Sequence, residues 1–177
     1  MKKVALFILL LIGFSGYSQV KWMSLKDAVE LQKNNPKKIL ISFYSEKCSS
    51  CNSMERITFS HPVIAELINK YYYPVKFNAE SRETFNFTGR KFSNTDYSKD
   101  PKKTAFNDFT KYMNVTSAPS IVFLDEALKP ITKLQGVLSA KELEPYLPFI
   151  GGNELKKITS RQQWENYQRK FRSSIKD

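Results

Sequence analysis

The sequence predicts an α/β fold in which a central mixed β-sheet is flanked by helices on both faces. Three observations lead to this prediction. Segments with helical spacing of apolar residues alternate with short apolar strands. Residues 37–44, KKILISFY, are apolar almost without interruption from Ile39 onward, as in a strand at the centre of a sheet. Two later strands are joined by a short turn, which is typical of antiparallel neighbours.

The first 18 of the 177 residues predict an export signal. Lys2 and Lys3 precede an apolar run at residues 4–14, and the small residues Gly16 and Ser18 fit a signal peptidase site. A membrane anchor is the alternative, but a spanning helix needs about 20 apolar residues. We therefore expect cleavage after Ser18, a periplasmic or secreted protein, and no membrane contact beyond the signal. Disulfides persist in such oxidising compartments.

Residues 19–177 have the length of a single domain. Without Lys2 and Lys3, this part has 26 basic and 17 acidic residues, a net charge of +9. Its lysine-rich stretches, NPKK, DPKK and ELKK, are scattered and lack interleaved aromatic residues. We therefore expect a solvated basic surface and no nucleic-acid partner. We also expect a monomer.

The first expected helix lies before the central strand, at residues 24–36. It opens with an S-x-x-D cap at Ser24 and ends at Pro36, and its apolar residues have helical spacing: Leu25, Ala28, Val29 and Leu31. Residues 49–60 and 61–72 then predict two more helices, with Ser60 as the N-cap of the second and Pro62 in its first turn. Residues 73–78 predict the next strand.

Residues 79–104 are polar and predict an insertion before the third core helix, which we place at residues 105–113. A short hairpin is expected around Thr88 and Gly89. The insertion carries three phenylalanines, Phe85, Phe87 and Phe92. They are either contacts for a partner or a small core of the insertion itself, and both interpretations stay open.

The last third of the chain predicts two strands followed by helices. The strands are residues 119–125 and 131–136. Ser139 and Glu142 form a capping-box pattern, and Pro145 is expected to shorten or kink the helix that follows. Residues 151–177 predict a helical extension that docks on the domain through one apolar face, formed by Trp164, Tyr167 and Phe171.

The two cysteines of the chain, Cys48 and Cys51, follow the central strand in the stretch EKCSSCN. Active and binding sites of α/β proteins usually lie at this edge of the sheet, just beyond the carboxyl ends of its strands. A redox dithiol, a metal site and a structural staple are the possible roles. A closed zinc site needs four ligands, and the chain adds only His61 to the cysteines. A staple around so short a loop would stabilise little. We favour redox chemistry, with no metal and no cofactor.

The segments ILISFYSEKCSSCNSME, SAPSIVFLDE and ITKLQG together resemble the thioredoxin fold, in particular small exported bacterial thioredoxin-like proteins. The resemblance covers residues 22–150. It implies that Cys48 is the nucleophile, that Cys51 is the resolving thiol, and that Pro119 follows a cis peptide bond and faces them. The backbone of Ala118 would then be free to pair with an extended substrate.

The physical chemistry of a C-x-x-C pair fits these roles. If Cys48 is the N-cap of a helix, both cysteines lie on one face with Cα atoms about 5–6 Å apart, as a disulfide requires. The N-terminal end of the helix would also lower the pKa of Cys48.

Several residues depart from the family pattern, which often has tryptophan before the first cysteine and Gly-Pro between the two. Here these positions hold Lys47, Ser49 and Ser50. Lys47 would lower the pKa of Cys48 and Glu46 would raise it, unless both side chains are simply solvated. Many thioredoxins have a buried acid on the central strand, where this chain has Ser42, and serine cannot act as a carboxylate base.

The sequence thus predicts a thiol-disulfide oxidoreductase of the bacterial envelope that reacts through mixed disulfides. Its partners would be protein or peptide disulfides and thiols, together with a further redox partner. Reduction, oxidation and isomerisation all stay open as the direction. The alternative is a thioredoxin-like binding module that lacks enzymatic activity, in which the insertion and the basic surface do the work.

Overall fold

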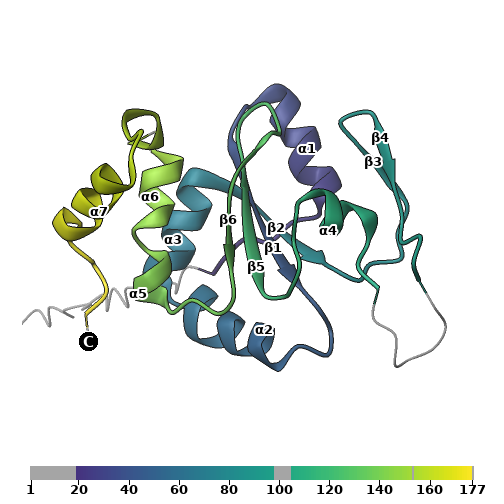
Figure 1. Ribbon diagram of the computed structural model, residues 1–177, viewed down its shortest axis with the longest axis horizontal. Coiled ribbons are helices and arrows are strands. Elements are labelled where there is room, and N and C mark those ends of the chain that lie inside the picture. Colours follow the sequence, from purple (N-terminus) through teal and green to yellow (C-terminus); the bar gives the residue numbers. More distant parts are fainter. Residues whose placement is uncertain (1–18, 98–104, 153, 177) are drawn as a thin grey trace, which may run out of the picture.

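The computed structural model describes residues 19–97, 105–152 and 154–176, and the expected export signal at residues 1–18 lies outside them. A four-stranded sheet forms the centre of the domain, in the order β2-β1-β5-β6 (Figure 1). Its strands are β1 (Lys38–Tyr44), β2 (Tyr72–Asn78), β5 (Ser120–Leu124) and β6 (Pro130–Gln135). β1 pairs in parallel with β2, whereas β5 is antiparallel to both its neighbours. The predicted mixed sheet is confirmed.

Helices cover both faces of the sheet, as predicted (Figure 1). On one face lie α1 (Leu25–Asn34), α4 (Asp108–Tyr112) and a hairpin of β3 (Phe85–Phe87) and β4 (Arg90–Phe92). The other face packs against α3 (Pro62–Tyr71), α5 (Ala140–Leu143) and α6 (Tyr146–Gly151). All of β1 except Tyr44 is buried, and its side chains alternate between the two cores, as a central strand requires.

Helix α1 begins where the capping pattern predicts, because the Ser24 hydroxyl accepts a hydrogen bond from the Asp27 N–H at 3.1 Å. Its buried face differs from the expected one. Leu31 is 45% exposed, whereas Gln32 is buried. The Gln32 amide donates to the Glu126 carbonyl at 2.7 Å and accepts from the Lys37 N–H at 2.9 Å. Two backbone groups are thus satisfied by a polar side chain whose burial the apolar spacing did not indicate.

The helix predicted at residues 49–60 consists of α2 (Ser49–Met54) and a π-helical segment, η1 (Glu55–Phe59). The expectation that Ser60 caps α3 is wrong by one residue. Ser60 still has helical backbone angles and closes η1 with a hydrogen bond from its N–H to the Glu55 carbonyl. His61 is extended, and its Nδ1 accepts from the Val63 N–H at 3.3 Å, so it is the N-cap.

The hairpin predicted in the insertion is present, and its two-residue turn is Thr88 and Gly89. Both residues have positive φ, 49° and 79°, as the type I′ turn of a tight hairpin requires. Residues 98–104, at the end of the predicted insertion, lie outside the described ranges.

We expect Gly89→Val to lower the free energy of unfolding by about 1–2 kcal/mol, because a side chain at Cβ disfavours the left-handed conformation. A new Cβ would meet nothing within 4 Å, so crowding is not the cause. Urea denaturation measures the effect. The control is Gly89→Asn, because asparagine tolerates this conformation, and equal losses for the two variants would contradict the explanation.

The phenylalanines of the insertion pack into the domain around Phe109 of α4. Phe87 and Phe92 are 2% and 1% exposed, and their ring centroids lie 5.1 and 5.4 Å from that of Phe109. Phe85 is partly buried and lies 5.4 Å from the same ring. The burial of Phe87 and Phe92 contradicts a role as partner contacts. They belong to the main core of the domain and not to a separate small core of the insertion.

The C-terminal part docks on the far face of α6. The capping box at Ser139 and Glu142 is present, and the helix breaks at Pro145 into α5 and α6, as expected. Helix α7 (Arg161–Lys170) packs its aromatic side chains against Phe149, from which the Trp164 ring lies 4.6 Å away. Among the described residues, no helix is long and apolar enough to cross a membrane.

Candidate active site

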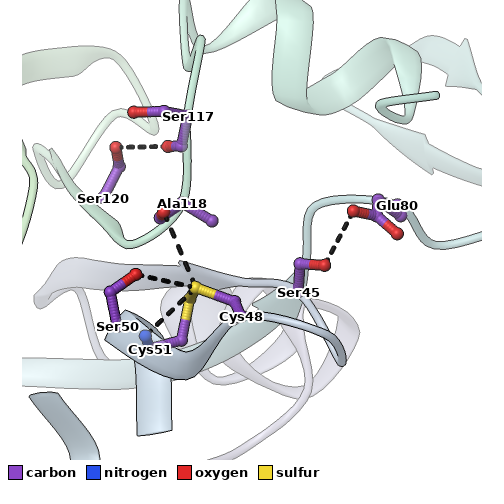
Figure 2. The surroundings of a disulfide bond; sticks show 8 residues. All are labelled: Ser45, Cys48, Ser50, Cys51, Glu80, Ser117, Ala118 and Ser120. Carbon is purple, nitrogen blue, oxygen red and sulfur yellow. Dashed lines mark hydrogen bonds between the residues drawn. A yellow bond between two sulfur atoms is a disulfide. The ribbon is translucent and has the colours of Figure 1, made fainter. Parts of the chain in front are cut away.

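The two cysteines lie just beyond the carboxyl end of β1 and form a disulfide (Figure 2). Cys48 is the N-cap of α2, with extended backbone angles, and Cys51 lies in the first turn. Their Cα atoms are 5.2 Å apart, within the predicted range. The pair therefore closes without distortion of the helix that carries it.

Two hydrogen-bond donors converge on the sulfur of Cys48 (Figure 2). The Cys51 N–H donates to Cys48 Sγ at 3.0 Å, and the Ser50 Oγ lies 3.2 Å from the same sulfur. In the disulfide the sulfur has no hydrogen, so the serine hydroxyl is the donor. The same two groups would stabilise a thiolate at Cys48 after reduction.

Exposure distinguishes the two cysteines. Cys48 is partly exposed, whereas Cys51, in the first turn of α2, is only 8% exposed. A large substrate can therefore reach the sulfur of Cys48 more easily than that of Cys51. This difference fits the roles that the resemblance implies for the two cysteines.

The predicted cis peptide between Ala118 and Pro119 is present, and its loop lies beside the dithiol. The Ala118 carbonyl oxygen is 3.6 Å from Cys48 Sγ (Figure 2). Two hydrogen bonds hold the loop: the Ser120 hydroxyl donates to the Ser117 carbonyl at 2.8 Å, and the Gly136 N–H donates to the Pro119 carbonyl at 2.9 Å. The structure thus brings residues 48 and 118 together across 70 positions of sequence.

Glu46 and Lys47 are both exposed on the loop between β1 and α2. The described residues provide no ion pair for either side chain, so their influence on Cys48 stays a prediction. The loop itself is fastened by Ser45, whose hydroxyl donates to Glu80 Oε1 at 2.7 Å (Figure 2). The active-site loop is in this way attached to the start of the insertion.

Ser42, at the position for which the resemblance implies an acid, is buried and lines one small cavity together with Cys51. It lies opposite Lys76 in the register of β1 and β2. A small cavity of about 50 Å³ lies beside Cys51, and its lining includes Ser42, Cys51, Glu55, Lys76 and Pro119.

Sequence reasoning missed Glu55 and Lys76. Glu55 Oε2 accepts from the Lys76 ammonium at 2.9 Å, and Glu55 Oε1 accepts from the indole N–H of Trp22 at 3.3 Å. The available signal was the spacing of Glu55, four residues after Cys51 in the same helical segment. No cluster of three or more potential metal-ligating side chains occurs within the described ranges.

Comparison with known proteins gives a family and a fold that are consistent with this site. A family model described as a thioredoxin-like domain matches residues 25–151. No curated protein matches the sequence. A thioredoxin from Thermus thermophilus has a TM-score of 0.55 and 18% identity, with 75% of this chain and 87% of that chain covered. A thioredoxin-fold protein from Helicobacter pylori has a TM-score of 0.55 and 17% identity, with 76% and 84% covered. At these identities the structural likeness shows the fold.

Proposed function

Because this chain belongs to the thioredoxin-like domain family, we propose that it is a thiol-disulfide oxidoreductase of the bacterial cell envelope. One observation carries the proposal. The partly exposed Cys48 sulfur lies at a helix N-cap, receives two hydrogen bonds, and is joined to a buried Cys51 one turn away. The envelope location rests on the export signal predicted at residues 1–18.

In the reducing direction the reaction has two exchange steps. The Cys48 thiolate attacks one sulfur of a substrate disulfide, and the other substrate sulfur leaves as a thiolate that takes a proton from water. Cys51 then loses its proton and attacks Cys48 Sγ. The mixed disulfide breaks, the second substrate sulfur leaves, and the Cys48–Cys51 bond forms. Oxidation of a dithiol substrate is the same sequence in reverse.

The loop at Ala118 and Pro119 is suited to hold an extended substrate chain. The Ala118 N–H makes no hydrogen bond within the described part of the chain, and its carbonyl lies beside the reacting sulfur. Main-chain pairing there would place the substrate cysteine next to Cys48 whatever its neighbouring side chains are. We therefore propose protein or peptide disulfides and thiols as the substrate class.

Alkylation of the reduced protein tests the proposal. At a mildly acidic pH, we expect iodoacetamide to label Cys48 before Cys51 and faster than it labels a cysteine in an unstructured peptide. The reason is that the two donors and the helix end raise the thiolate fraction of Cys48, while burial protects Cys51. Mass spectrometry of partly labelled protein gives the two rates.

The control is the same protein labelled in denaturant, where the two cysteines should react alike. Equal labelling in the folded protein, or labelling of Cys51 first, would show that the roles are assigned wrongly. If both thiols react more slowly than the peptide, the dithiol is inert. The binding-module alternative would then be favoured.

A further inference from the structure

The resolving cysteine has to exchange a proton in every catalytic cycle, because a thiol attacks a disulfide only as its thiolate. Cys51 is 8% exposed, so its proton has little direct access to water. On the central strand, Ser42 is buried and lines the same cavity as Cys51, but a serine cannot accept that proton as a carboxylate would. The buried thiol therefore requires another route.

Glu55 provides a carboxylate where α2 ends and η1 begins, and its N–H still donates to the Cys51 carbonyl. Positions four residues apart in an α-helix lie on one face, one turn from each other. Here both residues line the cavity of about 50 Å³ below the disulfide. A cavity of this size has room for at least one water molecule, for which roughly 10–15 Å³ is needed. One bridging water would connect the Cys51 thiol with the Glu55 carboxylate.

Contacts from three other elements fix the carboxylate and its partner. Lys76 of β2 donates to one oxygen at 2.9 Å, and Trp22 of the N-terminal segment donates to the other at 3.3 Å. The Lys76 ammonium also lies 5.4 Å from the ring centre of Tyr44 on β1. Lys76 and Trp22 hold the carboxylate, Tyr44 supports Lys76, and 42% of the Glu55 side chain stays exposed. Glu55 therefore reaches both the cavity and the solvent.

We propose that Glu55 is the proton relay of Cys51, a role that rests on the oxidoreductase function proposed above. During resolution the bridging water takes the proton of the Cys51 thiol and passes one of its own to the Glu55 carboxylate. The thiolate attacks Cys48 Sγ, the bond from Cys48 to the substrate breaks, and the substrate leaves as a thiolate. Glu55 then releases the proton to the solvent. In the opposite direction, protonated Glu55 returns it to Cys51.

The test separates the two exchange steps with 5,5′-dithiobis(2-nitrobenzoate) in stopped flow. One equivalent reacts with the reduced protein in two phases: Cys48 attack releases the first coloured thiolate, and Cys51 attack releases the second. We expect Glu55→Gln to slow the second phase by about a hundredfold, the lower end of the range for general-base effects, and to leave the first phase unchanged.

The pH dependence of the second-phase rate distinguishes a proton relay from a structural role of Glu55. In the wild type the second-phase rate should change little between about pH 6 and about pH 8, because assistance by a carboxylate makes the attack independent of the hydroxide concentration. In Glu55→Gln the rate should rise about tenfold per pH unit, in proportion to the thiolate fraction of Cys51. Glu55→Asp, which keeps the carboxylate, should restore part of the rate and the flat profile.

Glu66→Gln is the matched control, because Glu66 is an exposed glutamate on the neighbouring helix α3. It should change neither phase. An unchanged second phase in Glu55→Gln, or a slower phase with the wild-type pH profile, would overturn the relay while leaving the oxidoreductase function intact. A wild-type protein without a rapid first phase would instead contradict that function.

Discussion

Cys48→Ser is expected to lower the catalysed reduction of a protein disulfide by about a thousandfold or more, since the hydroxyl that replaces the thiolate is a far weaker nucleophile. The geometry around Cys48 predicts this loss: the residue is partly exposed, and its sulfur receives two hydrogen bonds and lies beside the Ala118 carbonyl. Reduction of insulin by dithiothreitol, followed by turbidity, measures the effect.

Cys51→Ser should block the second exchange step, because Cys48 can still attack the substrate but no thiol is left to resolve the mixed disulfide. We expect a mixed disulfide to accumulate, visible by mass spectrometry without reductant. Ser49→Ala is the control, because this exposed hydroxyl belongs to the same motif and does not contact the sulfur. Turnover by Cys48→Ser, or the absence of a trapped species in Cys51→Ser, would show that the pair does not act in this order.

Phe109→Ala is expected to give the largest loss of stability, about 3–5 kcal/mol in the free energy of unfolding. Phe109 is completely buried. Its ring is in contact with five other rings, at centroid distances from 5.1 to 6.1 Å: Phe43, Phe77, Phe85, Phe87 and Phe92. Truncation to alanine leaves a cavity. The five surrounding rings are attached to four different strands, so they cannot all move inward to fill it.

Tyr112→Ala is the matched control for this prediction. Tyr112 lies on the same helix and contacts Phe92, but it is 45% exposed, so its removal should cost less than about 1.5 kcal/mol. Urea denaturation compares the two variants. Similar losses would mean that the aromatic cluster is not the centre of this half of the core.

The sheet could be predicted from the sequence because its strands are short apolar runs between strong breakers. Each predicted strand lies within a residue or two of the observed one. Capping patterns likewise located the beginnings of α1 and α5 at Ser24 and Ser139. The cap of α3 was misplaced because serine is the usual cap, whereas the backbone of Ser60 is still helical and leaves His61 to do the capping.

Two parts of the site illustrate what sequence can and cannot indicate. The C-x-x-C pattern and the downstream proline identified residues that the fold brings together, because both motifs mark a fixed backbone geometry. Glu55 and Lys76 have no such motif. Their pairing depends on the tertiary fold, which brings Glu55 at the start of η1 next to Lys76 of β2 although they are 21 positions apart. Gln32 was missed for a similar reason. Its two partners are backbone groups outside α1, namely the Glu126 carbonyl and the Lys37 N–H.

The position of Phe109 has a consequence for related sequences. Phe109 belongs to a core helix, yet two of the rings that shield it from solvent, Phe87 and Phe92, belong to the hairpin. Without the hairpin, a large apolar side chain would lie open to water at this place. Homologues with a shorter connection between β2 and α4 should therefore carry a smaller or more polar residue at the position of Phe109. Loss of the hairpin and loss of the aromatic side chain should occur together across the family.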